Sequence, residues 1–600
     1  MSLLGKSLRL SGLLLSMMSA PLPAAALQGV SFDVSGGDAA LTATLKNSSL
    51  LAGLQASGRT EPQDILAAAL ADYGRLLDAL YAEGHYGGVI TIHIDGREAA
   101  AIQTFAVPDR VQRVTVRVVP GPQFRFATTD VGPLPAGATP LPGFARGEPA
   151  PATVIREAVA SGVSDWRDAG HAKATISAQA LVADHRNATL SADIRLAPGP
   201  RVTFGRLNQR TPSAVRSARI DQIAGLPTGE TFSPRELQRV AERLRRTGAF
   251  SSVALSEAET LGPGNTMDIN VDLADEPPRR FGFGAEVSSR EGVALSGYWL
   301  HRNLLGGAER FRAEANVAGI DGTLAGMDAA VSARLDIPAA LGTDTDVFVF
   351  AEAAYEDEPN YLLIEGSARA GIRHRFSDRL KGEIAASYGY TYTDDDLGQR
   401  RFSVVSLPSS LTWDGRNDPL DPSSGLFVDA DIEPFYDIIG SQVAARGYVD
   451  GRAYLGLGGD DQFVLAARAQ AGVVIGAVAA AVPPDMLFFS GGGGTVRGFP
   501  YQSLGIDQGG GTIVGGRAFL GASGEIRYRI SDSFGAVAFV DAGHIGQNTF
   551  FDAGGDWQIG AGVGLRYYTG MGPVRLDVAL PVEGPGGDGM QFYIGIGQSF

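Results

Sequence analysis

From residue 281 to the end of the chain, apolar and polar side chains alternate with a period of two. At the start of this region Phe281, Phe283 and Ala285 alternate with glycines and a glutamate. The same pattern returns, now with charged residues at the polar positions, in 310–317, 525–530 and 574–580. Successive side chains of a β-strand point to opposite faces, so this period predicts strands with one apolar and one polar face.

Charged residues on the polar face separate two interpretations of this region. A soluble sandwich would bury them at a high cost, whereas a transmembrane β-barrel places them in a wet lumen. Placing Arg527 on the lipid side at mid-depth would cost about 2–4 kcal/mol. The chain has 80 glycines and only 19% charged residues, as is typical of such barrels. At roughly ten residues a strand, the region predicts an antiparallel barrel of about 16 strands, with 14 or 18 also compatible.

The N-terminus has the three parts of a secretory signal peptide over residues 1–26. Two basic residues precede a short apolar stretch, Leu10–Met18, which is too short to span a bilayer as a helix. Ala24 and Ala26 form an A-x-A cleavage motif, so the mature chain is expected to begin at Leu27. A retained anchor helix is the alternative.

Composition excludes several classes of function. The chain has no cysteine, so thiol catalysis, disulfides and thiolate metal sites are excluded. Its net charge of −16 argues against nucleic acid as a partner. The segment 560–564 resembles a dinucleotide loop but leads into a strand, and Asp394–Asp396 lacks the turn and the distal Glu of a calcium loop. We therefore expect no catalytic residue, no cofactor and no metal, and a protein that is not an enzyme.

A repeat occupies the first half of the chain. A Pro-Gly-Pro junction at 120–122 returns at 198–200, and a degenerate copy lies at 275–281. Each junction follows an alternating strand, and upstream of each a helix ends at a glycine suited to a left-handed cap. These glycines are Gly84, Gly170 and Gly248. The pattern predicts three units of strand, helix, helix, strand, strand.

Each unit resembles a POTRA domain, and the predicted boundaries are 27–121, 122–199 and 200–277. The Pro/Ala/Gly-rich segment 132–151 departs from the pattern at the first helix of the second unit. An open sheet edge in such a unit can bind an extended chain by adding a strand. The alternative is that the units are spacers.

Within the predicted barrel, residues 278–600, four glycines precede the sequence Val496, Arg497, Gly498 and Phe499. Consecutive glycines permit a loop to fold sharply against a neighbouring surface. An arginine among apolar neighbours needs a carboxylate partner, and the candidates downstream are Asp541 and Glu525. An ordinary surface loop is the alternative.

A signal peptide, three POTRA-like units, the motif 496–499, the segment 414–425 and a final Phe together resemble the Omp85 superfamily. The resemblance implies that the loop at about 485–515 folds into the lumen, where Arg497 pairs with Asp541, with Glu525 as a second candidate. A last strand that ends in a C-terminal Phe resembles the recognition signal of outer-membrane barrels. Glycines weaken this strand, which must close the barrel. The predicted lateral seam between first and last strands consists of Phe281, Phe283, Ala285, Ile594, Ile596 and Phe600.

The resemblance implies an outer-membrane factor that inserts or translocates β-barrel and autotransporter proteins without ATP, with its repeats in the periplasm. Its partners would be membrane lipid and unfolded outer-membrane clients, and no nucleic acid. Three repeats favour the TamA branch of the superfamily, which implies an inner-membrane-anchored, TamB-like partner. The alternative is a two-partner-secretion transporter that passes a polypeptide through the lumen; the plug helix usual at its N-terminus is missing before the first repeat.

Overall fold

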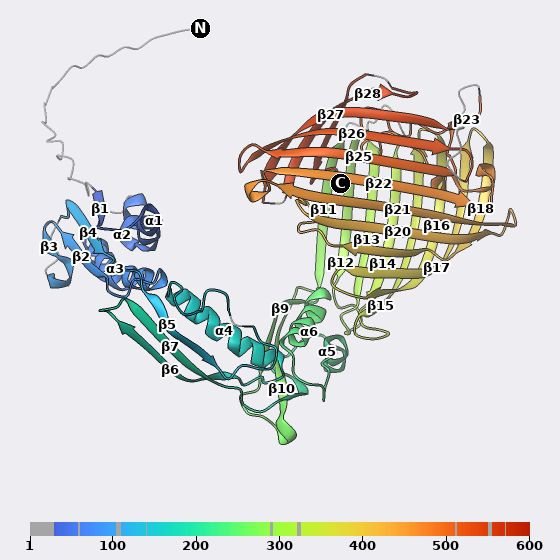
Figure 1. The fold of residues 1–600 in the computed structure, drawn as a ribbon. Helices are drawn as coiled ribbons and strands as arrows, with labels where there is room; N and C mark the ends of the chain where they lie inside the picture. The colour runs from blue at the N-terminus through green and yellow to red at the C-terminus, as the bar shows by residue number, and fades with distance from the viewer. Residues whose placement is uncertain are drawn as a thin grey trace, which may run out of the picture. The chain divides into compact units, whose positions relative to one another are not determined.

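The computed structural model describes most of the chain as two compact bodies (Figure 1). The first body holds two small α/β units, and the second holds a third unit together with a large β-sheet. The described residues are 29–57, 61–103, 110–139, 141–288, 292–320, 326–509, 513–549, 555–570, 572–587 and 589–600. The predicted signal peptide, with Ala24 and Ala26, lies outside them. In the described part of the chain, no helix has the length and hydropathy needed to cross a bilayer.

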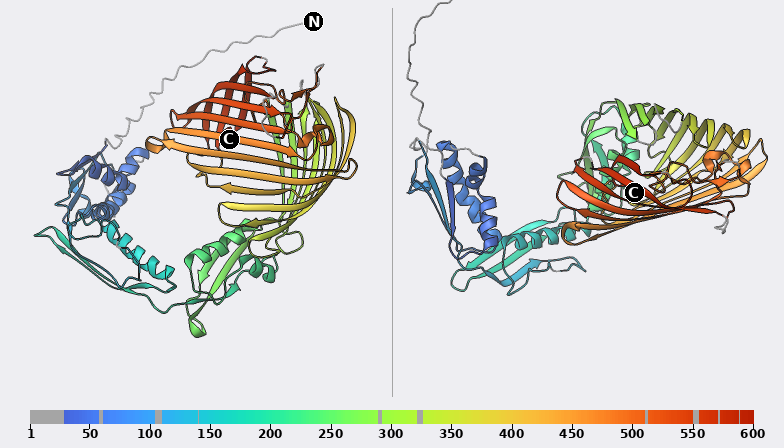
Figure 2. Two further views of the ribbon diagram at one scale, coloured as in Figure 1. Left: turned by 45° about the vertical axis from the view of Figure 1, so that its right-hand side comes forward. Right: turned by 90° about the horizontal axis from the view of Figure 1, so that it is seen from above.

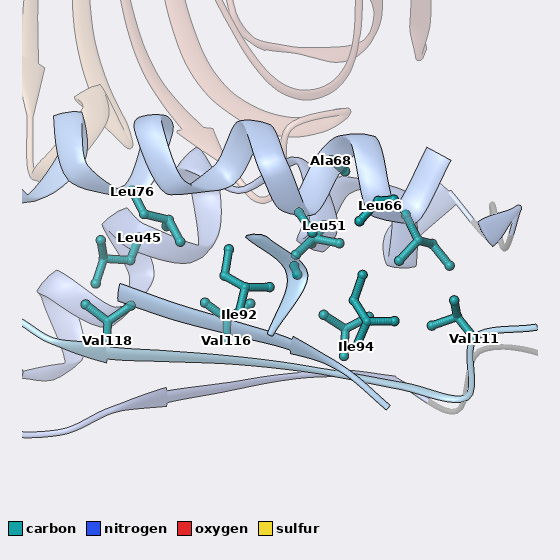
Figure 3. Close-up of a cluster of buried hydrophobic side chains, with 14 of the residues drawn as sticks. Leu45, Leu51, Leu66, Ala68, Leu76, Ile92, Ile94, Val111, Val116 and Val118 are labelled. Carbon is teal, nitrogen blue, oxygen red and sulfur yellow. The ribbon is translucent and has the colours of Figure 1, made fainter. Parts of the chain in front are cut away.

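The first unit packs three helices on one face of a four-stranded sheet with the order β1-β4-β2-β3. Its elements are β1 (Gly29–Val34), α1 (Ala39–Ser48), α2 (Leu50–Ser57), α3 (Pro62–Ala82), β2 (Val89–Ile94), β3 (Arg97–Glu98) and β4 (Arg113–Val119). Figure 3 shows its core, where Leu45, Leu51 and Leu76 of the helices face Ile92 and Val116 of the sheet. These side chains are buried, as helical and alternating apolar patterns require.

A buried carboxylate fixes the helix junction of this unit. Asp72 of α3 accepts hydrogen bonds from the Ser49 hydroxyl (2.6 Å) and from the backbone N–H groups of Leu50 (2.7 Å) and Leu51 (3.1 Å). The N–H groups at a helix start lack partners within the helix, so Asp72 caps α2 from a neighbouring helix.

The second unit has one helix where the repeat pattern predicts two. Its elements are β5 (Arg125–Gly132), α4 (Ala152–Asp168), β6 (Thr175–Asp184) and β7 (Thr189–Ala197), with the sheet order β5-β7-β6. The segment between β5 and α4 forms turns in its described residues, because its prolines and glycines do not sustain a helix. Strand β6 is an edge, exposed along its length, and leaves Ile176 and Leu181 in solvent.

The third unit has both helices. Its elements are β8 (Thr203–Gln209), α5 (Ser217–Ala224), α6 (Pro234–Arg246), β9 (Phe250–Glu257) and β10 (Thr266–Asp275), with the sheet order β8-β10-β9. Helix α6 begins at Pro234, and proline is well suited to the first position of a helix. The glycines Gly84, Gly170 and Gly248 follow α3, α4 and α6 with φ of 85°, 95° and 67°, the left-handed conformation predicted for them.

Helix α5 of the third unit packs against two turns of the large sheet within the same body. Ile220 and Ala224 share a buried cluster with Ala308 and Ala339, which lie in the turns after the second and fourth strands of that sheet. Gln222 adds a hydrogen bond from its amide to the Ala339 carbonyl at 2.9 Å. A common apolar core therefore joins this unit to the sheet.

The large sheet is antiparallel throughout and contains 17 strand segments in chain order. They are β11 (Arg279–Ser288), β12 (Gly292–His301), β13 (Arg310–Ile320), β14 (Asp328–Ile337), β15 (Thr345–Glu358), β16 (Tyr361–Arg375), β17 (Leu380–Asp395), β18 (Gly398–Ser406), β19 (Ser409–Asp414), β20 (Gly425–Asp437), β21 (Gln442–Leu457), β22 (Phe463–Ile475), β25 (Ala518–Arg529), β26 (Phe534–Gly546), β27 (Asp556–Thr569), β28 (Gly572–Glu583) and β29 (Gln591–Ile596). Both β18 and β19 pair with β17 on one side and β20 on the other, so the segments occupy sixteen positions. The predicted large all-β region is confirmed, and Figure 2 shows that the sheet curves strongly.

The two faces of this curved sheet differ as the alternation predicts. On β25 the outward residues Ile526 and Tyr528 are exposed, whereas their neighbours Glu525 and Arg527 are buried on the inner face. The same division holds on β28, where Leu576 is exposed and Asp577 is buried. An apolar outer face and a charged inner face are what a membrane barrel requires.

The sheet begins at β11 and ends at β29, and among the described residues no ladder of paired positions joins these two strands. Parts of them nevertheless lie within 8 Å of each other. Strand β29 covers only six residues. The two ends of the sheet are thus adjacent, and no ladder joins them in the part of the chain that the structure describes.

Phe600, a member of the predicted seam, does not share the exposed face of Ile594 and Ile596. Gly597 has φ of 88°, which ends the strand and turns the chain away from it. The N–H of Gly597 donates to the Pro573 carbonyl at 2.7 Å, and Phe600 is buried beside Tyr454. The last residues therefore fold against the inner face.

Candidate functional site: a buried ion cluster on the inner face

The loop of residues 476–517, between β22 and β25, packs on the inner face of the sheet. It contains η4 (Ala479–Ala481), η5 (Pro484–Met486), β23 (Ile506–Asp507) and β24 (Ile513–Val514). Val482, Phe488 and Leu504 of the loop form a buried cluster with Phe519 and Ile545 of the sheet. Apolar packing therefore holds this loop on the sheet on either side of Arg497.

Arg497 lies in this loop with only 2% of its surface exposed. Its Nε and Nη2 donate to the two oxygens of Asp541, at 2.7 and 3.0 Å, and its backbone N–H donates to Asp541 Oδ2 at 3.2 Å. A bidentate arginine–carboxylate pair fixes orientation as well as distance. Asp541 stands on β26, so this pair joins the loop to a strand near the C-terminal end of the sheet.

Two further carboxylates face the same guanidinium. Arg497 Nη1 donates to Asp577 Oδ2 of β28 at 3.1 Å. The same nitrogen lies 2.8 Å from Glu525 Oε1 of β25, but that oxygen lacks a hydrogen bond of good geometry, so this contact is one of charge. The guanidinium also lies 3.4 Å from the ring centroid of Phe539, a cation–π contact.

Two arginines of the sheet complete the charge balance. Arg527 Nη2 lies 2.9 Å from Glu525 Oε2, and Arg566 Nη1 bonds to Asp577. With Arg497 and Asp541, these residues make three buried cations and three buried carboxylates; we call this set the ion cluster. Buried charges persist only when they are paired, and the ion cluster satisfies that condition.

Glycines in the sheet make room for the loop. A Cβ on Gly560 of β27 would lie 1.9 Å from the carbonyl oxygen of Arg497. A Cβ on Gly543 of β26 would lie 2.4 Å from Ser490 Oγ and 2.7 Å from a methyl of Val496. Gly498 itself has φ of 100°, a conformation that other residues rarely adopt. Close approach of loop and sheet therefore requires glycine at these positions.

The ion cluster also reaches the end of the chain. The N–H of Gly498 donates to the Tyr593 hydroxyl of β29 at 3.0 Å. Arg566 Nε donates to Gln598 Oε1 at 2.7 Å, and Arg527 Nη2 donates to the Phe600 carbonyl oxygen at 3.0 Å. The last strand and the residues after it are thus held from the inner face.

The structure brings together the motif residues and both predicted partners, Asp541 and Glu525. Val496 and Phe499, on either side of the arginine and glycine, are buried as well. The seam residues Phe281, Phe283, Ile594 and Ile596 are exposed, with Phe283 at 89%. Ala285 lies in β11, and its side chain is outside the described structure. Phe600 does not lie at the seam.

Sequence reasoning missed Asp577, Tyr593 and the role of Gly560. The period-two pattern of β28 did place Asp577 on the polar face, which was the available signal. Tyr593 stands between the outward Phe592 and Ile594, so the alternation along the strand also predicts that its side chain faces inward. Within the described residues, no three His, Asp or Glu side chains are grouped as a metal site.

Comparisons with known proteins agree with this architecture. Residues 303–600 match the Omp85 superfamily domain, a range that holds the large sheet from β13 onward and its inward loop. A solved structure of BamA from Haemophilus ducreyi lacking POTRA domains 1-3 is similar over 79% of this chain and 99% of its own, with 15% identity and a TM-score of 0.62. That likeness shows a shared fold.

Two other solved structures have lower TM-scores. CdiB from Escherichia coli is similar over 79% of this chain and 90% of its own, with 15% identity and a TM-score of 0.48. BamA POTRA3-5 from Haemophilus influenzae matches 42% of this chain and 96% of its own, with 16% identity and a TM-score of 0.30. Of these three, the BamA structure from H. ducreyi alone scores high enough to support a shared fold.

Proposed function

We propose that this protein is a bacterial outer-membrane assembly factor that helps to insert or translocate β-barrel and autotransporter proteins. The observation that carries the proposal is that the first and last strands of the sheet, β11 and β29, are adjacent without a ladder between them in the described residues, and that the loop with Arg497 holds β29 from inside. An Omp85 superfamily domain over residues 303–600 supports the same class of role.

The position of β11 and β29 at the two ends of the sheet suggests the mechanism. An edge strand presents free N–H and C=O groups that pair with another extended chain. A client strand that pairs with β11 or β29 would satisfy its backbone before it meets lipid, where every unpaired group costs several kcal/mol. The protein supplies a template and no chemical step, so we propose neither a catalytic residue nor a cofactor.

The three α/β units would lie in the periplasm and dock extended clients. Strand β6 supports this role, since it is a ten-residue free edge beside the exposed Ile176 and Leu181. Strand addition to such an edge is a common mode of peptide recognition. Three such units also support the narrower proposal of a TamA-like protein with a TamB-like partner anchored in the inner membrane.

Locking the two edges together tests the proposal. Cysteines introduced by Ala285→Cys and Ile594→Cys, joined by a flexible bismaleimide, should abolish client assembly in cells or in proteoliposomes. Each single-cysteine variant, treated in the same way, is the matched control and should remain active. Normal assembly by the locked protein would show that β11 and β29 need not separate for a client to be inserted.

The rival role, passage of one polypeptide through the lumen, gives a different result in the same samples. A secretion pore would conduct ions and would continue to transport its substrate with the two edges locked. Single-channel conductance of the locked and unlocked proteins in planar bilayers therefore separates the two functions.

A further inference from the structure

Helix α6 and two turns of the large sheet enclose a cavity of about 200 Å³ at the end of the sheet where the third unit docks. The lining includes Arg243 and Arg246 of α6, Asp344 from the turn before β15, and Arg375 and Ser377 at the end of β16. These elements belong to one compact body.

Both oxygens of the Asp344 carboxylate already pair with arginines. Arg243 Nη2 lies 2.8 Å from Asp344 Oδ2, and Arg246 Nη2 lies 2.9 Å from Oδ1. Burial alone would raise the pKa of Asp344, but hydrogen bonds and charge from the two arginines outweigh it and lower this pKa to about 2. Asp344 therefore stays ionised and has no remaining capacity for Arg375.

Arg375 is the cation left over. Its side chain is partly buried, and among the described residues no carboxylate forms an ion pair with it. Arg239, another lining residue, pairs with Glu236 of its own helix. Glu242 and Asp378 also line the cavity, but neither forms an ion pair with Arg375 among the described residues.

We propose that this cavity binds a phosphate group, and that its source is the phosphodiester headgroup of an anionic membrane lipid. Arginine is suited to phosphate because its planar fork donates two parallel hydrogen bonds. Arg246 and Arg375 line the cavity with the hydroxyl-bearing Ser377, and a phosphodiester carries one negative charge that would pair with the guanidinium of Arg375.

The position of the cavity identifies the lipid as the source. Phe376, which lines the cavity next to Arg375, is 60% exposed at the end of the strand. Exposed aromatic side chains at strand ends mark the level of the headgroups in membrane barrels. This assignment rests on the proposed membrane location, but binding is measured without any assembly assay, so the two proposals can fail separately.

Lipid retention by the purified full chain tests the site. Native mass spectrometry in detergent, with phosphatidylglycerol or with inorganic phosphate added, should show saturable phosphatidylglycerol binding that Arg375→Gln weakens at least fivefold. Arg375→Lys keeps the charge and should retain most of the affinity. Arg379→Gln removes a cation from the same turn outside the cavity and should bind as the wild type does.

The two ligands distinguish the source of the phosphate. Saturable binding of inorganic phosphate that Arg375→Gln removes, without any lipid binding, would keep the phosphate site but overturn the lipid as its source. Equal phosphatidylglycerol binding by wild type, Arg375→Gln and Arg379→Gln would overturn the site itself. Circular dichroism of each variant shows whether the sheet has folded.

Discussion

The backbone N–H of Gly498 donates to the Tyr593 hydroxyl at 3.0 Å, across 95 positions of the chain. This bond joins the centre of the inward loop to the strand that ends the large sheet. Movement of the loop would therefore remove this contact with β29, and a displaced β29 would remove it from the loop. The ion cluster and the proposed seam are mechanically coupled at this point.

Replacing Tyr593 with Phe tests that coupling. The variant removes the acceptor for the Gly498 N–H and should lower local stability by about 1 kcal/mol. Hydrogen exchange at Gly498 should then be roughly fivefold faster. Tyr567→Phe on the outer face is the matched control, and equal exchange in both variants would contradict the coupling.

Arg497→Ala should destabilise the protein far more than loss of a surface arginine. It leaves Asp541, Asp577 and Glu525 buried with two cations, and breaking a buried pair in this way costs about 3–5 kcal/mol. Arg529→Ala removes a partly exposed pair with Asp421 and should cost at most about 1 kcal/mol. Urea unfolding of both variants measures the difference, and similar losses would count against the ion cluster as a unit.

Gly560→Ala should expel the loop, because the new Cβ would lie 1.9 Å from the Arg497 carbonyl oxygen. Arg497 is a trypsin site that is buried in the wild type, so limited trypsin digestion should now cut after it. Gly524→Ala is the control, since nothing lies within 4 Å of the position that its new methyl group would take. Protection of Arg497 in the Gly560 variant would show that the close approach is not needed.

The docking of the third unit should depend on pH through Asp344. Its pKa falls from 3.8 to about 2 on folding, so its contribution is present above about pH 4 and is lost as the pH falls toward 2. Wild type should exceed Asp344→Asn by about 2 kcal/mol of unfolding free energy at pH 7. That gap should shrink between pH 4 and pH 2, whereas Asp378→Asn should show no comparable gap at any pH.

The free edge of β6 should bind extended clients. Leu181→Lys with Ile176→Lys places charges beside the edge and should weaken binding of an unfolded outer-membrane protein at least threefold, as measured by fluorescence anisotropy. Gln179→Lys adds a charge on the same strand without removing an apolar contact and serves as the control. Unchanged affinity in the double variant would assign the units to spacing alone.

Local rules predicted much of this architecture. The period of two from Phe281 predicted the strands and their two faces, and the cap glycines marked where α3, α4 and α6 end. The partners of Arg497 came from resemblance to a family, since nothing in the spacing of Asp541 or Glu525 defines a contact across the sheet.

The misses have physical causes. Phe600 continues the outward parity of Ile594 and Ile596, but one left-handed glycine, Gly597, redirects the chain. The described residues between β5 and α4 form turns, because the prolines and glycines of that segment do not sustain the helix of the repeat pattern. In the sequence, Gly560 only begins a segment that resembles a dinucleotide loop. The structure shows why this position is a glycine, because the carbonyl of Arg497 lies against it.

The ion cluster holds equal numbers of positive and negative groups, but they are not shared equally between loop and sheet. The loop contributes one cation, and the sheet contributes two cations and three anions. Withdrawal of the loop would leave a net negative charge in a confined space. The carboxylates left on the sheet would attract the guanidinium of Arg497. This attraction would bring the loop back to the inner face without any external energy source.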